Sequence, residues 1–134
     1  MTAKRLTKED IRNQSGILNP VGHVVLAFKD DAATVVAVTA LHATGLTDQD
    51  VLVYSAAEAT PRLRERVRTA SEAAGFGYEI TLMRRYLGFA EQGAGWLIAY
   101  APNDDVAQHI TDVATSHAAL CAVRYHRLVT EDLV

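Results

Sequence analysis

Residues 24–31, VVLAFKDD, join an apolar run typical of a buried strand to a short acidic segment that can begin a helix. A carboxylate at Asp30 or Asp31 can accept hydrogen bonds from the unpaired backbone N–H groups of a first helical turn. We therefore expect a strand followed by a helix that ends at Gly45. A second apolar run, VLVY at 51–54, then completes a strand-helix-strand unit.

The same order of elements recurs in the last third of the chain. Residues 96–105, WLIAYAPNDD, again lead from an apolar run into a helix-capping segment. An apolar stripe at helical spacing follows, and residues 122–125, AVRY, form the closing strand. Two such units predict a ferredoxin-like sandwich, an α+β fold with a four-stranded antiparallel sheet and helices on one face.

Residues 57–94 separate the two units and are predicted to form a helical hairpin inserted between the second and third strands, which gives the order βαβ-αα-βαβ. Thr60 followed by Pro61 is typical of an N-cap and a first helical position, so we expect the first helix of the hairpin to begin there and to end at Gly75. The second helix is expected over about 78–91.

The third strand is apolar on both faces, with Trp96, Ile98 and Tyr100 on one and Leu97 and Ala99 on the other. An open antiparallel sheet alternates apolar and polar residues, so a second layer must cover this one. The insert or a second subunit would supply that layer. We expect a homodimer, because exposed aromatic side chains mark interfaces. A small α/β fold with a parallel sheet is the alternative that the same pattern allows.

Length and composition indicate one domain at 23–134, preceded by a polar arm at 1–22 with one helical turn after Thr7. The net charge of -3 argues against nucleic-acid binding through overall charge. The sequence has no apolar run long enough to cross a bilayer and no signal-peptide pattern, so we expect a cytoplasmic protein. The single cysteine, Cys121, excludes an internal disulfide and is expected to be a buried thiol.

The sequence has no constellation that identifies a reaction. The five histidines are scattered, and paired cysteines, a glycine-rich phosphate loop and a nucleophile motif are all missing, so we predict no catalytic residue, metal site or cofactor. Arg124 and His126 alternate on the last strand and can hold an anion, with Tyr54 and Tyr125 as nearby hydrogen-bond donors. These four residues are the candidate site for a small ligand. A small enzyme that uses Arg124 and His126 is an alternative.

The insert carries six arginines, of which Arg62, Arg66, Arg84 and Arg85 are the candidate residues for binding a polyanion. Glutamates at helical spacing also fit ordinary surface pairing, and the strands lack the aromatic motif of a protein that reads single-stranded RNA. Binding of RNA or another polyanion is therefore a second alternative.

Several short segments resemble a known family. They are Val24–Phe28 with Asp30 and Asp31, Gly45, Glu79–Gly93 around Tyr86, and Tyr125–Leu133. Their order resembles that of small bacterial proteins related to the general stress protein family of the 17M type. His126 stands where that pattern has a glycine, and Leu128 stands near where it has an aromatic residue. The resemblance implies a stress-associated or regulatory role and supplies no catalytic residue.

Together these features predict a cytoplasmic, homodimeric, non-enzymatic module. It is expected to act in regulation or stress response by binding a protein or a small ligand.

Overall fold

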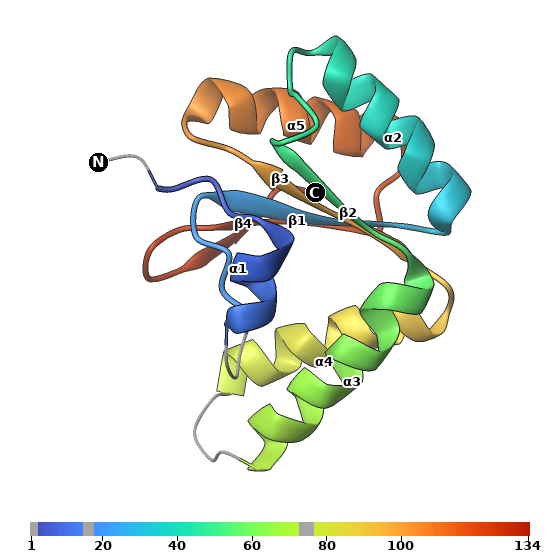
Figure 1. Ribbon diagram of the computed structural model, residues 1–134, viewed down its shortest axis with the longest axis vertical. Coiled ribbons are helices and arrows are strands. Elements are labelled where there is room, and N and C mark those ends of the chain that lie inside the picture. Colours follow the sequence, from blue (N-terminus) through green and yellow to red (C-terminus); the bar gives the residue numbers. More distant parts are fainter. Residues whose placement is uncertain (1–2, 15–17, 73–76) are drawn as a thin grey trace.

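A computed structural model describes residues 3–14, 18–72 and 77–134, and it describes their side chains except at 71, 72 and 77–79. Within these residues the chain has an α+β fold with five helices and one five-stranded sheet (Figure 1). The elements in chain order are α1 (Lys8–Asn13), β1 (His23–Phe28), α2 (Asp31–Ala43), β2 (Val51–Tyr54), α3 (Ala56–Glu72), α4 (Gly77–Glu91), β3 (Gly95–Tyr100), α5 (Asp104–Ser116), β4 (Cys121–Tyr125) and β5 (Thr130–Asp132).

The sheet has the strand order β2-β3-β1-β4-β5, and each of its four neighbouring pairs is antiparallel. Val25 at the centre of β1 lies between Ile98 of β3 and Val123 of β4. The two strands of each strand-helix-strand unit are not neighbours: β3 separates β1 from β2, and β1 separates β3 from β4. The antiparallel prediction is confirmed, and the parallel-sheet alternative is wrong.

The fifth strand corrects the prediction of four. β5 extends the sheet beyond β4, with Asp132 opposite Val123 and Thr130 opposite Tyr125. Its sequence, Thr-Glu-Asp, has no apolar alternation, and all three side chains are partly or fully exposed. Backbone hydrogen bonds of the edge position therefore define this strand, and side-chain patterning cannot predict it.

Helices cover both faces of the sheet (Figure 1). One core lies under α2 and α5 and contains Val24, Leu26 and Leu97. The other lies under α3 and α4 and contains Val25 and Trp96. Successive strand residues alternate between these two cores, which explains why the central strands are apolar on both sides. The second face is thus covered within one chain by the two helices that connect β2 to β3.

The start of α2 matches the expected capping. The Asp30 carboxylate accepts a hydrogen bond from the Ala33 backbone N–H at 2.8 Å. The helix ends at Ala43, and Gly45 follows with a φ of 109°, a left-handed conformation that favours glycine.

The start of α3 differs from the expectation. The helix begins at Ala56, so Pro61 lies inside it and Thr60 is not its N-cap. Ser55 and Glu58 form a reciprocal cap: the Ser55 hydroxyl accepts from the Glu58 N–H at 3.1 Å, and the Glu58 carboxylate accepts from the Ser55 N–H at 3.2 Å. The predicted stop at Gly75 lies outside the described residues. The second helix ends at Glu91, as expected.

The N-terminal segment packs against the sheet. Thr7 caps α1, in agreement with the helical turn expected after it. Ile11 and Leu18 are buried in the core under α3 and α4. The Leu6 backbone N–H donates to Nε2 of the buried His23 at 3.1 Å, which attaches this segment to the first residue of β1. Among the helices of the described ranges, none has the length and apolar content needed to span a membrane.

Candidate ligand-binding site

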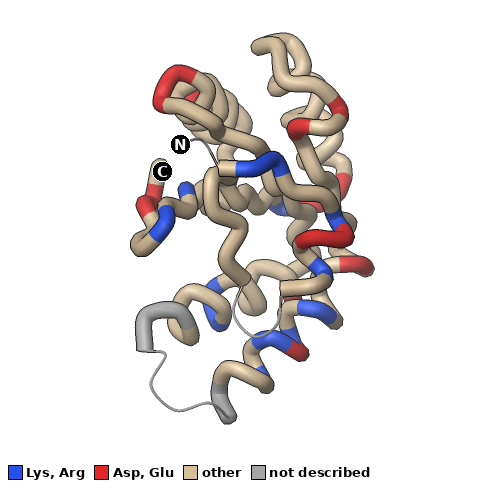
Figure 2. The backbone as a smooth tube through the Cα atoms, turned by 60° about the vertical axis from the view of Figure 1, so that its left-hand side comes forward, with Lys and Arg blue, Asp and Glu red and all other residues tan. Residues whose placement is uncertain are grey.

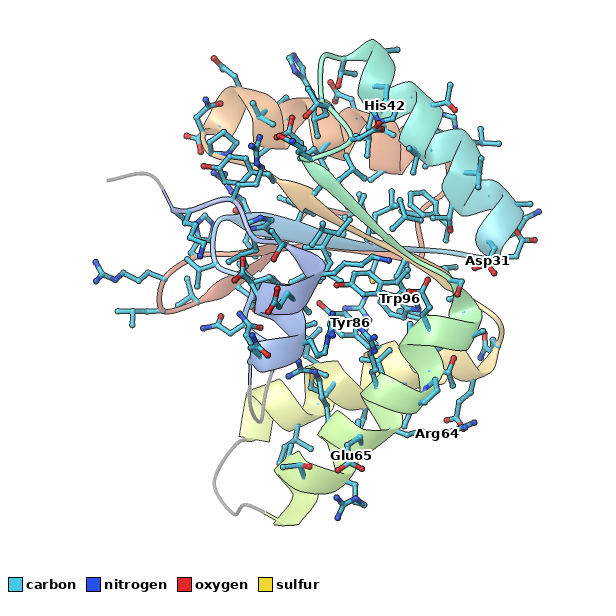
Figure 3. All side chains as sticks on the ribbon, viewed as in Figure 1. Asp31, His42, Arg64, Glu65, Tyr86 and Trp96 are labelled. Atoms are coloured by element: carbon cyan, nitrogen blue, oxygen red, sulfur yellow. The ribbon has the colours of Figure 1, made fainter. Side chains whose placement is uncertain are left out.

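A cavity of about 420 Å³ lies between the sheet and the helices α1, α3 and α4. Pockets of about 300–1,000 Å³ hold organic ligands in proteins. Figure 3 shows Tyr86 and Trp96 in the space between the sheet and α3–α4. The lining residues are Ile11, Arg12, Gln14, Leu18, Val25, Tyr54, Ala59, Pro61, Arg62, Leu63, Glu65, Arg66, Thr69, Tyr86, Trp96 and Ile98.

Helical and strand periodicity place these residues together. On α3, residues 59, 62, 63, 66 and 69 follow helical spacing and form one face. On the strands, Val25, Trp96 and Ile98 belong to the core on the α3–α4 side of the sheet. The lining is mostly apolar, so burial of an apolar ligand would favour binding.

Two buried polar atoms in the cavity lining have no partner. They are the hydroxyl oxygen of Tyr54 and Nε1 of Trp96, and among the described residues they are the buried side-chain atoms without a hydrogen bond. The two side chains are only 5% and 4% exposed. A buried polar group without a partner costs about 1–3 kcal/mol, and native proteins rarely leave one. Both donors belong to side chains of the cavity lining, and a small movement of either side chain would let an acceptor atom of a ligand satisfy it.

The Tyr54 phenol is a hydrogen-bond donor in a positive environment. Burial raises its pKa, the charges of Arg62, Arg66 and Arg12 oppose this rise, and Glu58 adds to it. The Arg62 guanidinium carbon lies 5.9 Å from the centre of the Tyr54 ring. A phenol whose pKa is raised stays protonated at neutral pH, so Tyr54 can donate a hydrogen bond but is not a base.

Tyr86 and Trp96 form a fixed aromatic wall. Their ring centres are 5.3 Å apart at an angle of 72°, an edge-to-face arrangement. The Tyr86 and Tyr125 hydroxyls are hydrogen-bonded at 2.8 Å. Burial raises the pKa of Tyr86 well above its ordinary value, so the Tyr86 hydroxyl stays protonated at neutral pH. Tyr125 thus forms a hydrogen bond with Tyr86, a residue of the cavity lining, and helps to fix the position of its ring.

The structure separates the four residues predicted to bind a ligand. Tyr54 lines the cavity, and Tyr125 contacts it through Tyr86. Arg124 lies on the other side of the sheet, where its Nη1 donates to Asp104 at 2.9 Å. His126 follows β4, and its Nε2 lies 3.0 Å from Glu131. Arg124 and His126 have different carboxylate partners, Asp104 and Glu131, and neither is among the described residues that line the cavity, so the geometry gives no support to the enzyme alternative.

The arginines predicted to bind a polyanion are also divided. Arg62 and Arg66 line the cavity, whereas Arg84 and Arg85 lie on α4. Nη1 of Arg85 lies 3.8 Å from Asp132. Figure 2 shows basic residues on both α3 and α4, with an acidic residue among those of α3.

Sequence reasoning missed Trp96, Tyr86 and Arg12 as site residues. A signal was present for Trp96, because a tryptophan on a strand that is apolar on both faces has an indole N–H that needs a partner. Tyr86 and Arg12 fit ordinary helical patterns, and only the folded chain brings them to the same cavity.

Within the described part of the chain, no group of three or more His, Cys, Asp or Glu residues is placed to hold a metal ion. Comparisons of the chain with protein-family models, curated proteins and solved structures found no match.

Proposed function

We propose that this protein is a cytoplasmic, non-enzymatic module that binds a small organic molecule in the cavity between the sheet and α1, α3 and α4. The observation that carries the proposal is the mostly apolar cavity of about 420 Å³, whose lining includes Tyr54 and Trp96, two side chains with donors that have no partner among the described residues. A ligand with an acceptor atom would satisfy these donors, and its apolar part would fill the remaining space.

A regulatory or stress-associated role is part of this proposal. Binding without chemistry fits a sensor, and the described residues that line the cavity include no histidine, cysteine or lysine to act as a nucleophile or a base near neutral pH. The resemblance of the chain to proteins related to the 17M-type general stress family points in the same direction.

The first test uses the chain's own reporter. Trp96 is the single tryptophan and lies in the cavity wall. Titration with the neutral fluorescent probe N-phenylnaphthylamine should enhance probe emission and quench Trp96 emission, both saturating at one probe per chain.

A cavity-filling variant makes this test specific. Ala59 lines the cavity, whereas Ala57 lies on the same helix and is exposed. Ala59→Leu should weaken probe binding at least about tenfold because the added side chain occupies the ligand's space, and Ala57→Leu should leave binding unchanged. Circular dichroism would check that both variants are folded. An absence of saturable binding, or an equal loss in both variants, would overturn the proposed function.

The finer fold assignment is also proposed here. We assign the chain to the ferredoxin-like sandwich with the α3–α4 hairpin as an insert between β2 and β3. The order β2-β3-β1-β4 and the position of α2 and α5 together on one face support this assignment.

Homodimerisation is a separate prediction. The original reason for it, an aromatic sheet face open to solvent, no longer applies because α3 and α4 cover that face. Its remaining support is the outer face of α2, where Val35 and Val36 are 61% and 54% exposed. Light scattering at micromolar concentration should give twice the chain mass of 14.6 kDa, and a mass of 14.6 kDa would contradict the prediction.

A further inference from the structure

We infer that the cavity selects an organic anion with a ring-bearing apolar body, and that Arg62, Arg12 and the Tyr54 hydroxyl recognise its negatively charged group. This inference rests on the proposed function, since it names the class of ligand for the same cavity.

The arginines of α3 differ in their partners. Arg64 lies 3.6 Å from Glu91, and Arg68 pairs with Glu65 one turn earlier. Arg62 and Arg66 are four residues apart and share the cavity face of the helix. Adjacent positive charges on one helix face repel each other, and a bound anion would relieve that repulsion.

Among the described residues, two arginines of the cavity lining have no acidic partner. Within the ranges that the structure describes, neither Arg12 nor Arg62 has a carboxylate within ion-pairing distance. Arg66 has a fixed position, because its Nη2 donates to the Ile11 carbonyl at 3.0 Å. Three guanidinium groups thus belong to one cavity, and two of them are available to a ligand.

The nearby carboxylates are already engaged. Glu65, the acidic residue of the lining, accepts hydrogen bonds from Arg68. Glu58 accepts from Lys8 at 3.2 Å and from the Ser55 N–H. Neither carboxylate neutralises the positive charge at Arg12 and Arg62, so the cavity attracts an anion.

The aromatic side chains that line the cavity indicate what the apolar part of the ligand is. Tyr54, Tyr86 and Trp96 place three aromatic rings around the cavity, and aromatic rings pack favourably against one another. A carboxylate beside the Tyr54 ring would lie close to Arg62, and a small movement of the Tyr54 side chain would let its buried hydroxyl donate to that carboxylate. Charge-assisted hydrogen bonds of this kind are stronger than neutral ones.

The experiment compares two ligands of equal shape and different charge. Naphthoate and its neutral amide, naphthamide, would each compete with N-phenylnaphthylamine for the cavity. In the unmodified protein, naphthoate should bind about tenfold or more tightly than naphthamide. Added salt should weaken the binding of naphthoate alone.

Variants test the assignment to particular residues. The double variant Arg12→Gln with Arg62→Gln should remove the preference for naphthoate while keeping the binding of the neutral probe. Arg127→Gln is the matched control, because Arg127 is exposed in the loop between β4 and β5 and should leave the preference intact.

The failures of the two proposals are distinguishable. Equal affinity for naphthoate and naphthamide in the unmodified protein, with the neutral probe still bound, would overturn the anion inference and leave the proposed function standing. A preference that survives in the double variant would overturn the assignment to Arg12 and Arg62. A cavity that binds neither the probe nor its competitors would overturn the proposed function itself.

Discussion

Cys121 lies at the first position of β4 and is 1% exposed. Burial raises the pKa of its thiol to about 11, with a smaller opposing effect from Arg85. Since the thiolate is the reactive form, a buried thiol with this pKa is inert at neutral pH. We predict that a maleimide labels Cys121 very slowly in the folded protein and completely in denaturant, as measured by mass spectrometry. Rapid labelling of the native chain would contradict this.

Single residues also show how far the site could be predicted. The sequence predicts that Tyr54 donates a hydrogen bond to a ligand, and among the described residues it is one of the two with a buried donor that lacks a partner. Trp96 was treated only as an apolar strand residue, because a pattern of hydrophobic positions does not say whether an indole N–H finds an acceptor. That information exists only after the neighbours of Trp96 have been placed. Arg124 and His126 were grouped because they alternate on a strand, but their partners lie on different elements.

At the scale of elements, local capping signals predicted both ends of α2 and misplaced the start of α3. Asp30 and Gly45 bound α2 closely, since a short carboxylate and a left-handed glycine are specific signals. For α3 the chain has two competing signals, Ser55 with Glu58 and Thr60 with Pro61. The Ser55–Glu58 signal determines the start of the helix because its reciprocal cap satisfies two backbone N–H groups. Pro61 has no backbone N–H and so satisfies none.

The attachment of the N-terminal segment is expected to depend on pH. His23 Nε2 accepts from the Leu6 N–H, so Nδ1 carries the proton and donates to the Val21 carbonyl at 3.0 Å. Only a neutral imidazole can make both bonds. The Tyr100 ring lies 5.1 Å away, and burial lowers the pKa of His23 below its ordinary value of 6.5.

The sign of the effect follows from proton binding. Below pH 6.5 the unfolded chain binds a proton at His23 that the folded chain does not, so the free energy of unfolding should fall as pH decreases toward the lowered pKa. Denaturant titrations across this range should show the decrease in the unmodified protein and a smaller one in His23→Gln. His109→Gln, at an exposed position, should behave like the unmodified protein. Identical pH profiles for all three proteins would rule out His23 as the cause.

At the scale of the whole molecule, the two strand-helix-strand units predicted the four main strands and their antiparallel sheet. Periodicity located these strands because their residues alternate between two buried cores, but the same pattern also allows a parallel sheet, and only the strand order decides between the two. The sequence allows either the insert or a second subunit to cover the second face of the sheet. Hydrophobic pattern alone cannot decide this, since an interface and a core require the same apolar residues. The position of the cavity depends on that covering, so it too was beyond the sequence.

The walls of the cavity come from three parts of the chain that are far apart in sequence: the N-terminal segment with α1, the strands, and the α3–α4 hairpin. A molecule that contacts all three would bind the folded chain and not the unfolded one, so its binding would add to the free energy of unfolding. Because the N-terminal segment is attached through the neutral form of His23, acid that weakens this attachment would also remove part of the occupant's contacts.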